Sequence, residues 1–518
     1  MLESHANDLY CMTAGGHPLA FQPRQQADSL IAQCNKMPRA ALLGCAFIAL
    51  ATAVAQAVAS DQVAPTSAAS ASEPADRSPS AKPAEVQGER SYALPAGEII
   101  GFDFLLNRIG RHFGDDRDDF RVTSDSIRRN LHSGWGTDKD PFQINQLGHP
   151  YQGAMYHGFA RSAGFDYWQS FGYTFAGSAL WELAGETTRP SRNDQVASGI
   201  GGTFLGEALF RMSNLVLEQG GGLPRFWREA AGAAIDPSAG FNRLAFGDRF
   251  SGIFSSRNAA YYSRLQFGYS GSVKQRAGTS TTEFRRNEAQ VDFSLDYGLP
   301  GSPDYEYTRP FDYFNFQATA SSANALENVM TRGLLVGRSY AAGDDYRGVW
   351  GLYGSYDYIA PQTYRVSTTA LSIGSTAQWW LGKTWSLQGT AMTGLGYAAV
   401  GTTRGAVGER DYNYGIAPQA LLALRLTDDD KASLDLTARE YFVSDVGSGT
   451  SGGHDNIIRA DASFTWRIAK QRAITIKVLG NRRDAKFTTL GSSRQTQVTA
   501  GIFYTFLGQD HFGTIDWR

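Results

Sequence analysis

Residues 458–467, IRADASFTWR, alternate strictly between apolar and polar side chains, and this stretch decides the fold. A period of two places successive side chains on opposite faces of a β-strand. Residues 291–297 and 314–320 repeat the pattern, with Val, Phe, Leu and Ala against Asp, Ser, Asn and Gln. Such strands turn one face to hydrocarbon and the other to a polar lumen, as in transmembrane β-barrels.

Segments of this kind continue through the second half of the chain. Each is close to the roughly 9–11 residues that a tilted strand needs to cross a bilayer, and their number is even, as in single-chain bacterial barrels. We therefore predict a transmembrane antiparallel β-barrel of about twelve strands, preceded by a small, mostly α-helical domain or plug. The predicted strands lie near 260–270, 286–297, 311–320, 329–340, 346–358, 364–380, 384–396, 410–426, 431–443, 456–468, 472–482 and 496–507.

The lengths of the connections predict the orientation of the barrel. Four connections are tight turns, at 341–345, 381–383, 427–430 and 469–471. The opposite connections are long and rich in Gly, Ser and Thr, at 271–285, 397–409, 444–455 and 483–495. Short turns face the periplasm in bacterial barrels, so we expect both barrel ends there. Three features depart from the pattern: 298–310 is long for a turn, 359–363 is short for an outer loop, and the chain runs past Phe506, which either ends the last strand or is followed by more of it.

Aromatic residues argue against the main alternative, a soluble all-β sandwich or propeller. They crowd the ends of the predicted strands, as interfacial girdles do in membrane barrels. These residues are Trp379, Trp380, Trp385, Tyr441, Phe442, Tyr504 and Phe506.

Composition excludes some functions. The formal net charge is −2, which offers no electrostatic reason to expect a nucleic-acid partner. The three cysteines, Cys11, Cys34 and Cys45, precede the expected mature start. We therefore expect no disulfide, thiol nucleophile or cysteine metal site in the mature chain.

A targeting signal lies inside the N-terminal region. A basic start at residues 36–39 is followed by an apolar run and by Ala57-Val58-Ala59, a small-x-small cleavage pattern. We predict an upstream extension at 1–36, a signal peptide at 37–59, a disordered linker at 60–90, a helical periplasmic or plug domain at 98–250 and the barrel at 251–518. A lipoprotein signal at Cys45 and a single-pass anchor are the alternatives. The expected location is the outer membrane, with outer-membrane lipids and the barrel-assembly machinery as partners and a periplasmic partner left open.

The region before the barrel is predicted to be helical. Helices are expected at about 153–186, with a break near Gly164, at 197–218 and at 222–232. Gly202 and Gly206 have small-xxx-small spacing, and small residues let helices approach closely. We therefore predict that these helices form a compact hairpin.

Residues 145–153 of this region, NQLGHPYQG, carry a resemblance to a known family. With the RSxGFxYW run from Arg161, WExxGE from Trp181 and RxxN from Arg211, this stretch resembles an uncharacterised family of Gram-negative outer-membrane proteins, a domain of unknown function with the motif NQxGHPYQG. The resemblance covers about residues 135–245. It implies envelope localisation and a helical unit joined to a barrel, and it implies no activity.

Polar residues of the helical region form the candidate site. Glu182 and Glu186 share one helix face, and Glu207, Arg211 and Asn214 share another. Carboxylates and a histidine meeting between helices would suit a metal ion or general acid–base chemistry. A purely structural network is the alternative, and we favour it, predicting no metal and no cofactor. The candidate cluster is His149, Tyr151, Gln152, Arg161, Glu182, Glu186, Glu207, Arg211 and Asn214.

Three functions fit these features. We expect an integral outer-membrane β-barrel, non-enzymatic, that acts in passage of a small or lipidic solute or in envelope maintenance. The second is a lipid-modifying hydrolase, which would need a serine nucleophile beside His454 in the stretch SGGHD at 451–455. The third is a structural or adhesive surface protein that uses its Gly- and Ser-rich loops.

Overall fold

The computed structural model describes residues 90–518 except 115, 139, 221, 278–281, 362–363, 403–411, 446–451 and 488–490. The described residues do not include the predicted upstream extension at 1–36 or the predicted signal peptide at 37–59. Of the predicted linker at 60–90, they include only residue 90.

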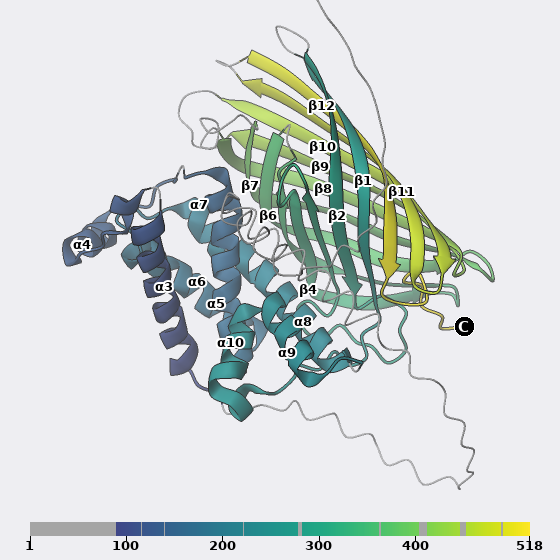
Figure 1. Cartoon of the computed structure of the whole chain (residues 1–518), viewed down its shortest axis with the longest axis horizontal. Coiled ribbons are helices and arrows are strands. Elements are labelled where there is room, and N and C mark those ends of the chain that lie inside the picture. Colours follow the sequence, from purple (N-terminus) through teal and green to yellow (C-terminus); the bar gives the residue numbers. More distant parts are fainter. Residues whose placement is uncertain are drawn as a thin grey trace, which may run out of the picture. The chain divides into compact units, whose positions relative to one another are not determined.

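The second half of the chain is a closed antiparallel β-barrel (Figure 1), as predicted. Every strand pairs with its neighbours in sequence, and β1 pairs with β12 to close the sheet. The strands are β1 (Tyr261–Ala277), β2 (Thr282–Tyr297), β3 (Phe314–Ser321), β4 (Asn328–Ala342), β5 (Tyr346–Ile359), β6 (Tyr364–Trp380), β7 (Trp385–Thr402), β8 (Tyr412–Asp428), β9 (Ala432–Asp445), β10 (Gly453–Ala469), β11 (Arg472–Phe487) and β12 (Gly491–Leu507).

Most strands are longer than predicted, so the long connections are shorter. The ladder of β1 and β2 continues through 271–276 and 282–285, and β10 and β11 stay paired up to Gly453 and Phe487. Backbone pairing does not need apolar side chains, so Ser-, Thr- and Gly-rich segments extend the barrel beyond its apolar belt. β3 is the exception, with eight residues.

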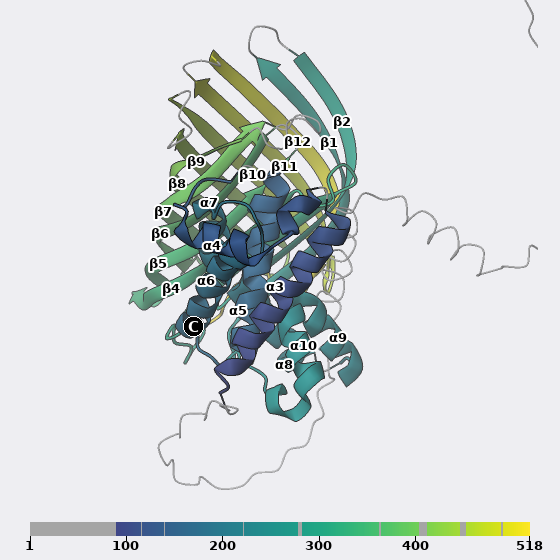
Figure 2. The same cartoon turned by 90° about the vertical axis from the view of Figure 1, so that its left-hand side faces the viewer.

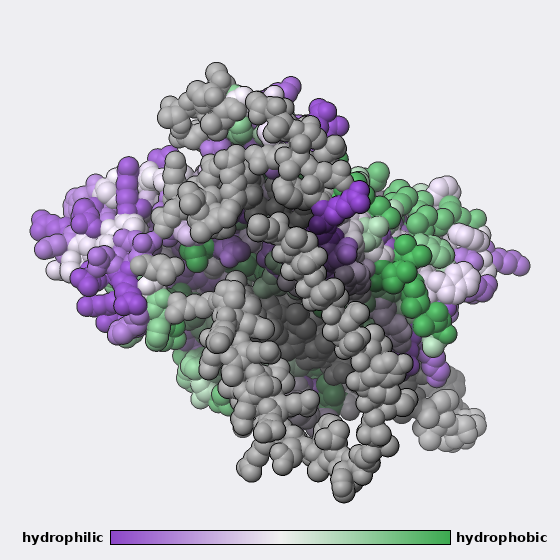
Figure 3. Space-filling view, turned by 45° about the horizontal axis from the view of Figure 1, so that its top comes forward, coloured by the Kyte–Doolittle hydropathy of each residue, from purple (hydrophilic) through white to green (hydrophobic). Residues whose placement is uncertain are grey.

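The two faces of the wall differ as a membrane barrel requires. On β10, Ile458, Phe464 and Trp466 point outward with 39%, 44% and 53% of their surface exposed, while Arg459 and Thr465 point inward and are buried. Ile476 on β11 and Val498 and Ile502 on β12 also point outward and are exposed, and Figure 3 shows hydrophobic side chains gathered on part of the molecular surface. Exposed apolar side chains on this part of the wall match the hydrocarbon of a bilayer. The fold is therefore a transmembrane β-barrel.

Ion pairs cross the lumen. Arg264 on β1 lies 3.0 Å from Asp435 on β9, and Arg425 on β8 lies 3.2 Å from Asp296 on β2. In neither pair are the two strands neighbours in the sheet, so these side chains span the interior. The cavity that they line has a volume of only about 110 Å³.

The segment after β12 does not add to a strand. It folds against inward-facing side chains at the end of the barrel that carries the tight turns. Phe512 packs with Tyr262, Leu299 and Ala473, and the Thr514 hydroxyl lies 3.1 Å from the hydroxyls of Ser386 and Thr427. The C-terminal segment 509–517 therefore occupies this mouth of the lumen.

Helices make up the part of the described chain that precedes the barrel (Figure 2). The predicted break near Gly164 is confirmed: Gly164 has φ 88°, and α6 begins after it with Asp166 capping the backbone of Gln169. Four α-helices of the described chain lie outside the predicted helix ranges, namely α3, α4, α7 and α10. The helices are α3 (Ala93–Phe113), α4 (Ser124–His132), α5 (His149–Ser162), α6 (Tyr167–Ala184), α7 (Arg192–Asp194), α8 (Gly202–Gln219), α9 (Arg225–Ile235) and α10 (Pro237–Phe246), with π-helical η2 (Ile144–Gly148) and η3 (Gln195–Gly201) and 3-10 helices η1 (Arg117–Phe120) and η4 (Gly247–Phe250).

In the part of the chain that the structure describes, no helix is both long and apolar enough to cross a membrane.

Close packing of α5 on α8 depends on the predicted small residues. A Cβ added to Gly153 would lie 1.9 Å from the Ser198 carbonyl oxygen, and one added to Gly202 would lie 2.6 Å from the Gly153 Cα. Neither position accommodates a side chain, so the glycines allow the two backbones to touch. This crossing brings the polar faces of α5 and α8 together.

One row of outward-facing wall residues shares a hydrophobic core with α8. In the register of the sheet, Leu265 pairs with Phe293, and the row continues strand by strand to Tyr414 on β8. Seven of its eight members belong to the same buried cluster as Phe204 and Met212 of α8. The row is Leu265, Phe293, Ala318, Val329, Tyr358, Ser367, Ala399 and Tyr414. We call it the docking row.

Candidate functional site

The structure divides the nine predicted site residues instead of bringing them all together. Arg161, Glu207 and Arg211 belong to one network, which also contains His157. Asn214 lies outside its hydrogen bonds: its side chain donates to the Phe210 carbonyl and accepts from the Phe254 backbone. His149, Glu182 and Glu186 belong to a second, around Asp194. Gln152 belongs to a third group, and Tyr151 points to the surface with 39% of its area exposed.

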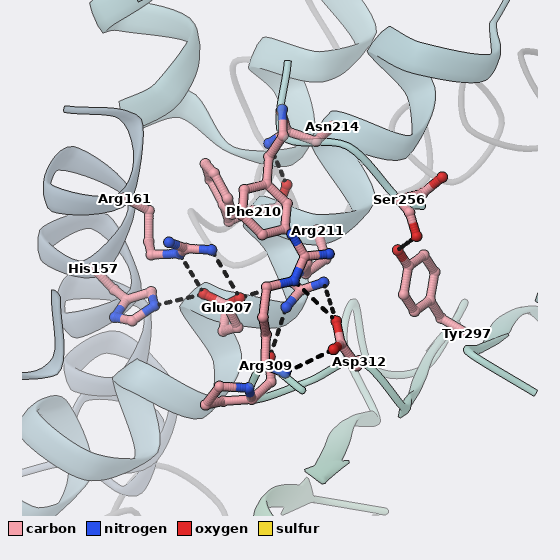
Figure 4. Close-up of polar contacts among 12 residues, drawn as sticks. His157, Arg161, Glu207, Phe210, Arg211, Asn214, Ser256, Tyr297, Arg309 and Asp312 are labelled. Atoms are coloured by element: carbon pink, nitrogen blue, oxygen red, sulfur yellow. Dashed lines mark hydrogen bonds and ion pairs between the residues drawn. The ribbon is translucent and has the colours of Figure 1, made fainter. Parts of the chain in front are cut away.

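Glu207 is the centre of the first network (Figure 4). Its Oε2 accepts from Arg161 Nε at 2.8 Å and lies 3.0 Å from His157 Nε2. Its Oε1 accepts from Arg211 Nε at 2.8 Å, one helical turn away on α8. The carboxylate is fully buried and both of its oxygens have cationic partners.

Arg211 extends this network to the barrel. Its Nη1 lies 3.1 Å from Asp312 Oδ1 in the connection between β2 and β3, and its Nη2 donates to the Pro310 carbonyl at 2.6 Å. Asp312 also pairs with Arg257 and Arg309. The connection 298–310, which is too long for a turn, thus leads to a buried anchor for α8.

The charge state of the network follows from these contacts. Burial by itself raises the pKa of Glu207, but Arg161, His157 and Arg211 hold that pKa well below its ordinary value. Burial lowers the pKa of His157, despite the neighbouring Glu207. At neutral pH the first network therefore holds a carboxylate, two guanidinium groups and a neutral imidazole. A carboxylate that does not take up a proton is a poor general acid, and the network suits a structural role.

The second group is acidic and buried. The side chains of His149, Glu182 and Asp194 each offer one ligand atom, and these atoms lie within 4.8 Å of one another. Glu182 Oε2 accepts from the backbone of Ser191 at 2.7 Å, and His149 Nδ1 lies 3.2 Å from Ser198 Oγ. Burial, followed by nearby carboxylates, raises the pKa of Glu182 and of Asp194 well above their ordinary values. Burial raises the pKa of Glu186 to about 7.

The third group is a short hydrogen-bonded chain. Gln152 Nε2 donates to the Tyr156 hydroxyl, which donates to Asp103 Oδ1 on α3. Burial raises the pKa of Asp103 to about 7, with the hydrogen bond from Tyr156 acting the other way. This chain links α3 to α5.

The NQLGHPYQG segment contributes to the second and third groups, through His149 and Gln152, and contacts the barrel. Asn145 Nδ2 lies 2.9 Å from the Tyr412 hydroxyl, and Gln146 Nε2 lies 3.0 Å from that of Tyr414, both on the barrel wall. His149 enters the acidic group, and Gly153 permits the crossing of α5 and α8. The segment therefore joins the helical region to the outward face of β8 and positions the second group.

Several residues of these networks were not predicted. Asp194 lies three residues after Ser191, whose side chain accepts from the Asp194 backbone. This Ser-x-x-Asp spacing is a helix N-terminus signal that marks Asp194 for a helix start. Asp103 and Asp312 lie far from the family-like segment, and no local pattern connects them to it.

His454, the histidine of the hydrolase alternative, lies at the start of β10. Its ring stacks on Phe442, with centroids 5.1 Å apart. Ser451 lies outside the described residues.

Comparison with solved structures finds outer-membrane barrels. The chain is similar to the NanC porin, with TM-score 0.22 and 7% identity over 46% of this chain and 98% of that one. It is similar to the outer membrane channel DcaP of Acinetobacter baumannii, with TM-score 0.22 and 8% identity over 48% and 97%. It is also similar to the translocator domain of autotransporter NalP from Neisseria meningitidis, with TM-score 0.22 and 12% identity over 51% and 94%.

Sequence comparisons add one result. No curated protein matches this chain. A family model does match part of the helical region, which confirms the predicted resemblance to an uncharacterised family. Residues 134–238 of this chain match the family described as Domain of unknown function (DUF3943).

Proposed function

We propose that this protein is a non-enzymatic outer-membrane barrel with a closed lumen, that its helical domain is the working part, and that it acts in envelope maintenance. In this proposal the domain docks on the outward face of the wall instead of filling the lumen as a plug. The docking row carries the proposal, because its outward-facing residues share one buried core with α8.

Polar contacts support the same docking. Asn193 Nδ2 lies 2.8 Å from the Tyr414 hydroxyl, and the Tyr356 hydroxyl donates to the Gln146 carbonyl. Tyr356 and Tyr414 lie on the same face of the wall as the exposed Trp350 and Ile416. Side chains on this face point away from the lumen.

The interior gives no support to passage of a solute in this state. The pairs Arg264–Asp435 and Arg425–Asp296 cross it, and segment 509–517 occupies one mouth. The cavity that these pairs line, about 110 Å³, is smaller than the roughly 300 Å³ or more of a pocket that binds a small molecule.

Membrane lipid is the partner that fits the outer surface of the helices. Phe104 and Phe113 of α3, Trp168 of α6 and Phe226 and Trp227 of α9 are each more than half exposed. Aromatic side chains mixed with arginine are typical of segments at a lipid headgroup boundary. A domain beside the belt of the barrel would bring these side chains to lipid.

A pair of cysteines tests the docking. A Cβ at Gly201 would lie 3.9 Å from the Thr369 Cβ on β6, within the range of about 3.5–4.5 Å found in disulfides. Residues 60–518 contain no cysteine, so Gly201→Cys with Thr369→Cys forms a clean pair. We expect oxidation to link it in the outer membrane. Gly201→Cys with Thr368→Cys is the control, because Thr368 faces the lumen. Linkage of the control pair alone would contradict docking on the wall.

Planar-bilayer recording tests the closed lumen, and the full chain should not conduct. A second candidate, gated passage of a small solute, is favoured by one observation: segment 509–517 joins no strand and is held in the lumen mouth by side-chain contacts, among them Gln378 Oε1, which accepts from the Ile515 backbone at 2.9 Å. Deletion of residues 509–518 separates the two. Steady conductance after deletion would favour gated passage. A silent barrel would favour the proposed closed lumen, because the ion pairs would still cross it.

A further inference from the structure

The acidic group of the helical domain has the composition of a metal site. His149 lies at the start of α5, Glu182 in α6 and Asp194 at the end of α7. These side chains are 7%, 0% and 1% exposed. Their ligand atoms lie within 4.8 Å of one another, and in a tetrahedral zinc site such atoms are roughly 3.3 Å apart. A shift of about 1 Å or less for each side chain would close the site around an ion.

Glu182 lacks a partner on one side. Its Oε2 accepts from the Ser191 backbone, but no donor among the described residues reaches its Oε1. A buried carboxylate oxygen without a hydrogen bond is costly, unless a cation or a proton occupies its lone pairs. This orphaned oxygen lies on a side chain that contributes to the cluster.

The charges around the group do not balance. The groups that act most strongly on Glu182 after burial are Glu186 and Asp194, and Asp138 acts on it in the same direction. All three are carboxyl groups. Glu207, buried to the same degree in the same domain, has two arginines. Buried carboxylates are paired, protonated or bound to metal ions. Among the described residues, no arginine pairs with Glu182 or Asp194 as Arg161 and Arg211 do with Glu207.

The surroundings would hold the ligands in place. Ser198 Oγ lies 3.2 Å from His149 Nδ1, which leaves Nε2 as the free ring nitrogen. Asn193 Nδ2 donates to Asp194 Oδ1 at 2.8 Å. Such outer contacts orient metal ligands. His149 directly follows the π-helical segment η2 and Asp194 directly precedes η3, and π-helical turns are rare and frequent at functional sites.

We propose that His149, Glu182 and Asp194 bind one divalent transition-metal ion, with Zn²⁺ as the best match. One imidazole nitrogen and two carboxylate oxygens suit Zn²⁺ better than Ca²⁺ or Mg²⁺, which take oxygen ligands. Three protein ligands leave a fourth position. This site goes beyond the proposed function, which needs no metal.

Metal analysis of the full chain tests the site. The untagged protein, folded in detergent, is stripped with a chelator, equilibrated with Zn²⁺ and passed over a desalting column. We expect one Zn²⁺ per chain. Glu182→Gln and Asp194→Asn should each lose most of it, with affinity lower by about tenfold or more. Asp103→Asn, which changes another buried carboxyl of the domain, is the matched control and should keep its metal. Folded variants that retain one Zn²⁺, or a wild-type chain that retains none, would overturn the proposal.

A second measurement uses only the wild-type chain, and it tests the site even if the variants do not fold. Co²⁺ replaces Zn²⁺ and reports its ligands through its visible absorption. Intense tetrahedral bands, lost on addition of Zn²⁺, would support the site. The weak spectrum of aqueous Co²⁺ would overturn it.

Discussion

Arg211 Nη1 lies 3.1 Å from Asp312 Oδ1, and this contact joins α8 to the connection between β2 and β3. Both side chains are buried. Because Arg211 also pairs with Glu207, one guanidinium group connects the polar core of the helical domain to the barrel.

Loss of this guanidinium group should loosen the helical domain. We expect Arg211→Ala to lower its free energy of unfolding by about 2–4 kcal/mol, because buried Asp312 and Glu207 each lose a partner. Thermal loss of the helical circular-dichroism signal in detergent measures the effect. Arg225→Ala is the control: Arg225 is exposed and 3.9 Å from Glu229, so its loss should cost less than about 1 kcal/mol. Equal effects of the two variants would contradict a buried anchor.

The glycine at the crossing of α5 and α8 should not tolerate a methyl group. Gly153→Ala places a Cβ 1.9 Å from the Ser198 carbonyl oxygen, so the helices must separate. We expect destabilisation by about 3 kcal/mol or more. Gly172→Ala in α6 meets nothing within 4 Å and should stabilise the helix by up to about 1 kcal/mol. Opposite signs in the same thermal assay are the expected result, and a neutral Gly153→Ala would mean that the helices do not touch there.

The tyrosine hydroxyls of β8 should hold the domain on the wall. Tyr412→Phe with Tyr414→Phe removes the partners of Asn145, Gln146 and Asn193. Each lost hydrogen bond should cost about 1 kcal/mol, more where an amide stays buried. Limited proteolysis should cut the helical region of this variant faster and leave the barrel intact. Tyr397→Phe keeps the ring that stacks on Tyr414 and serves as control. Unchanged cleavage would argue against docking through these hydroxyls.

The stability of the helical domain should fall as the pH rises through the range set by Asp103. Its pKa is raised by burial from 3.8 to about 7 in the folded chain. The folded chain therefore keeps a proton that the unfolded chain releases, so stability decreases from pH 4 to about pH 7 and levels off above it. Asp103→Asn should make this slope shallower, and Glu186, whose pKa burial also raises to about 7, contributes to the slope that remains. Melts across the range measure it, and a slope that persists unchanged in the variant would assign the effect to other groups.

The sequence by itself determined the barrel. The alternation in residues 291–297, 314–320 and 458–467 specifies which side chains face lipid, and a one-residue slip would bury charge in hydrocarbon. Strand order follows from short connections between neighbours, and Gly164 and Asp166 specify the break between α5 and α6.

Only the tertiary structure decided how the polar residues group. Glu182 and Glu207 belong to separate networks, because α5 meets Glu182 with His149, before its contact with α8 at Gly153, and Glu207 with His157, after it. Asp103 joins the third group through Tyr156, 53 positions away in the chain, and Asp312 joins the first network through Arg211, 101 positions away. Local spacing predicts which residues share a helix face, but their partners depend on which backbones approach closely enough to touch.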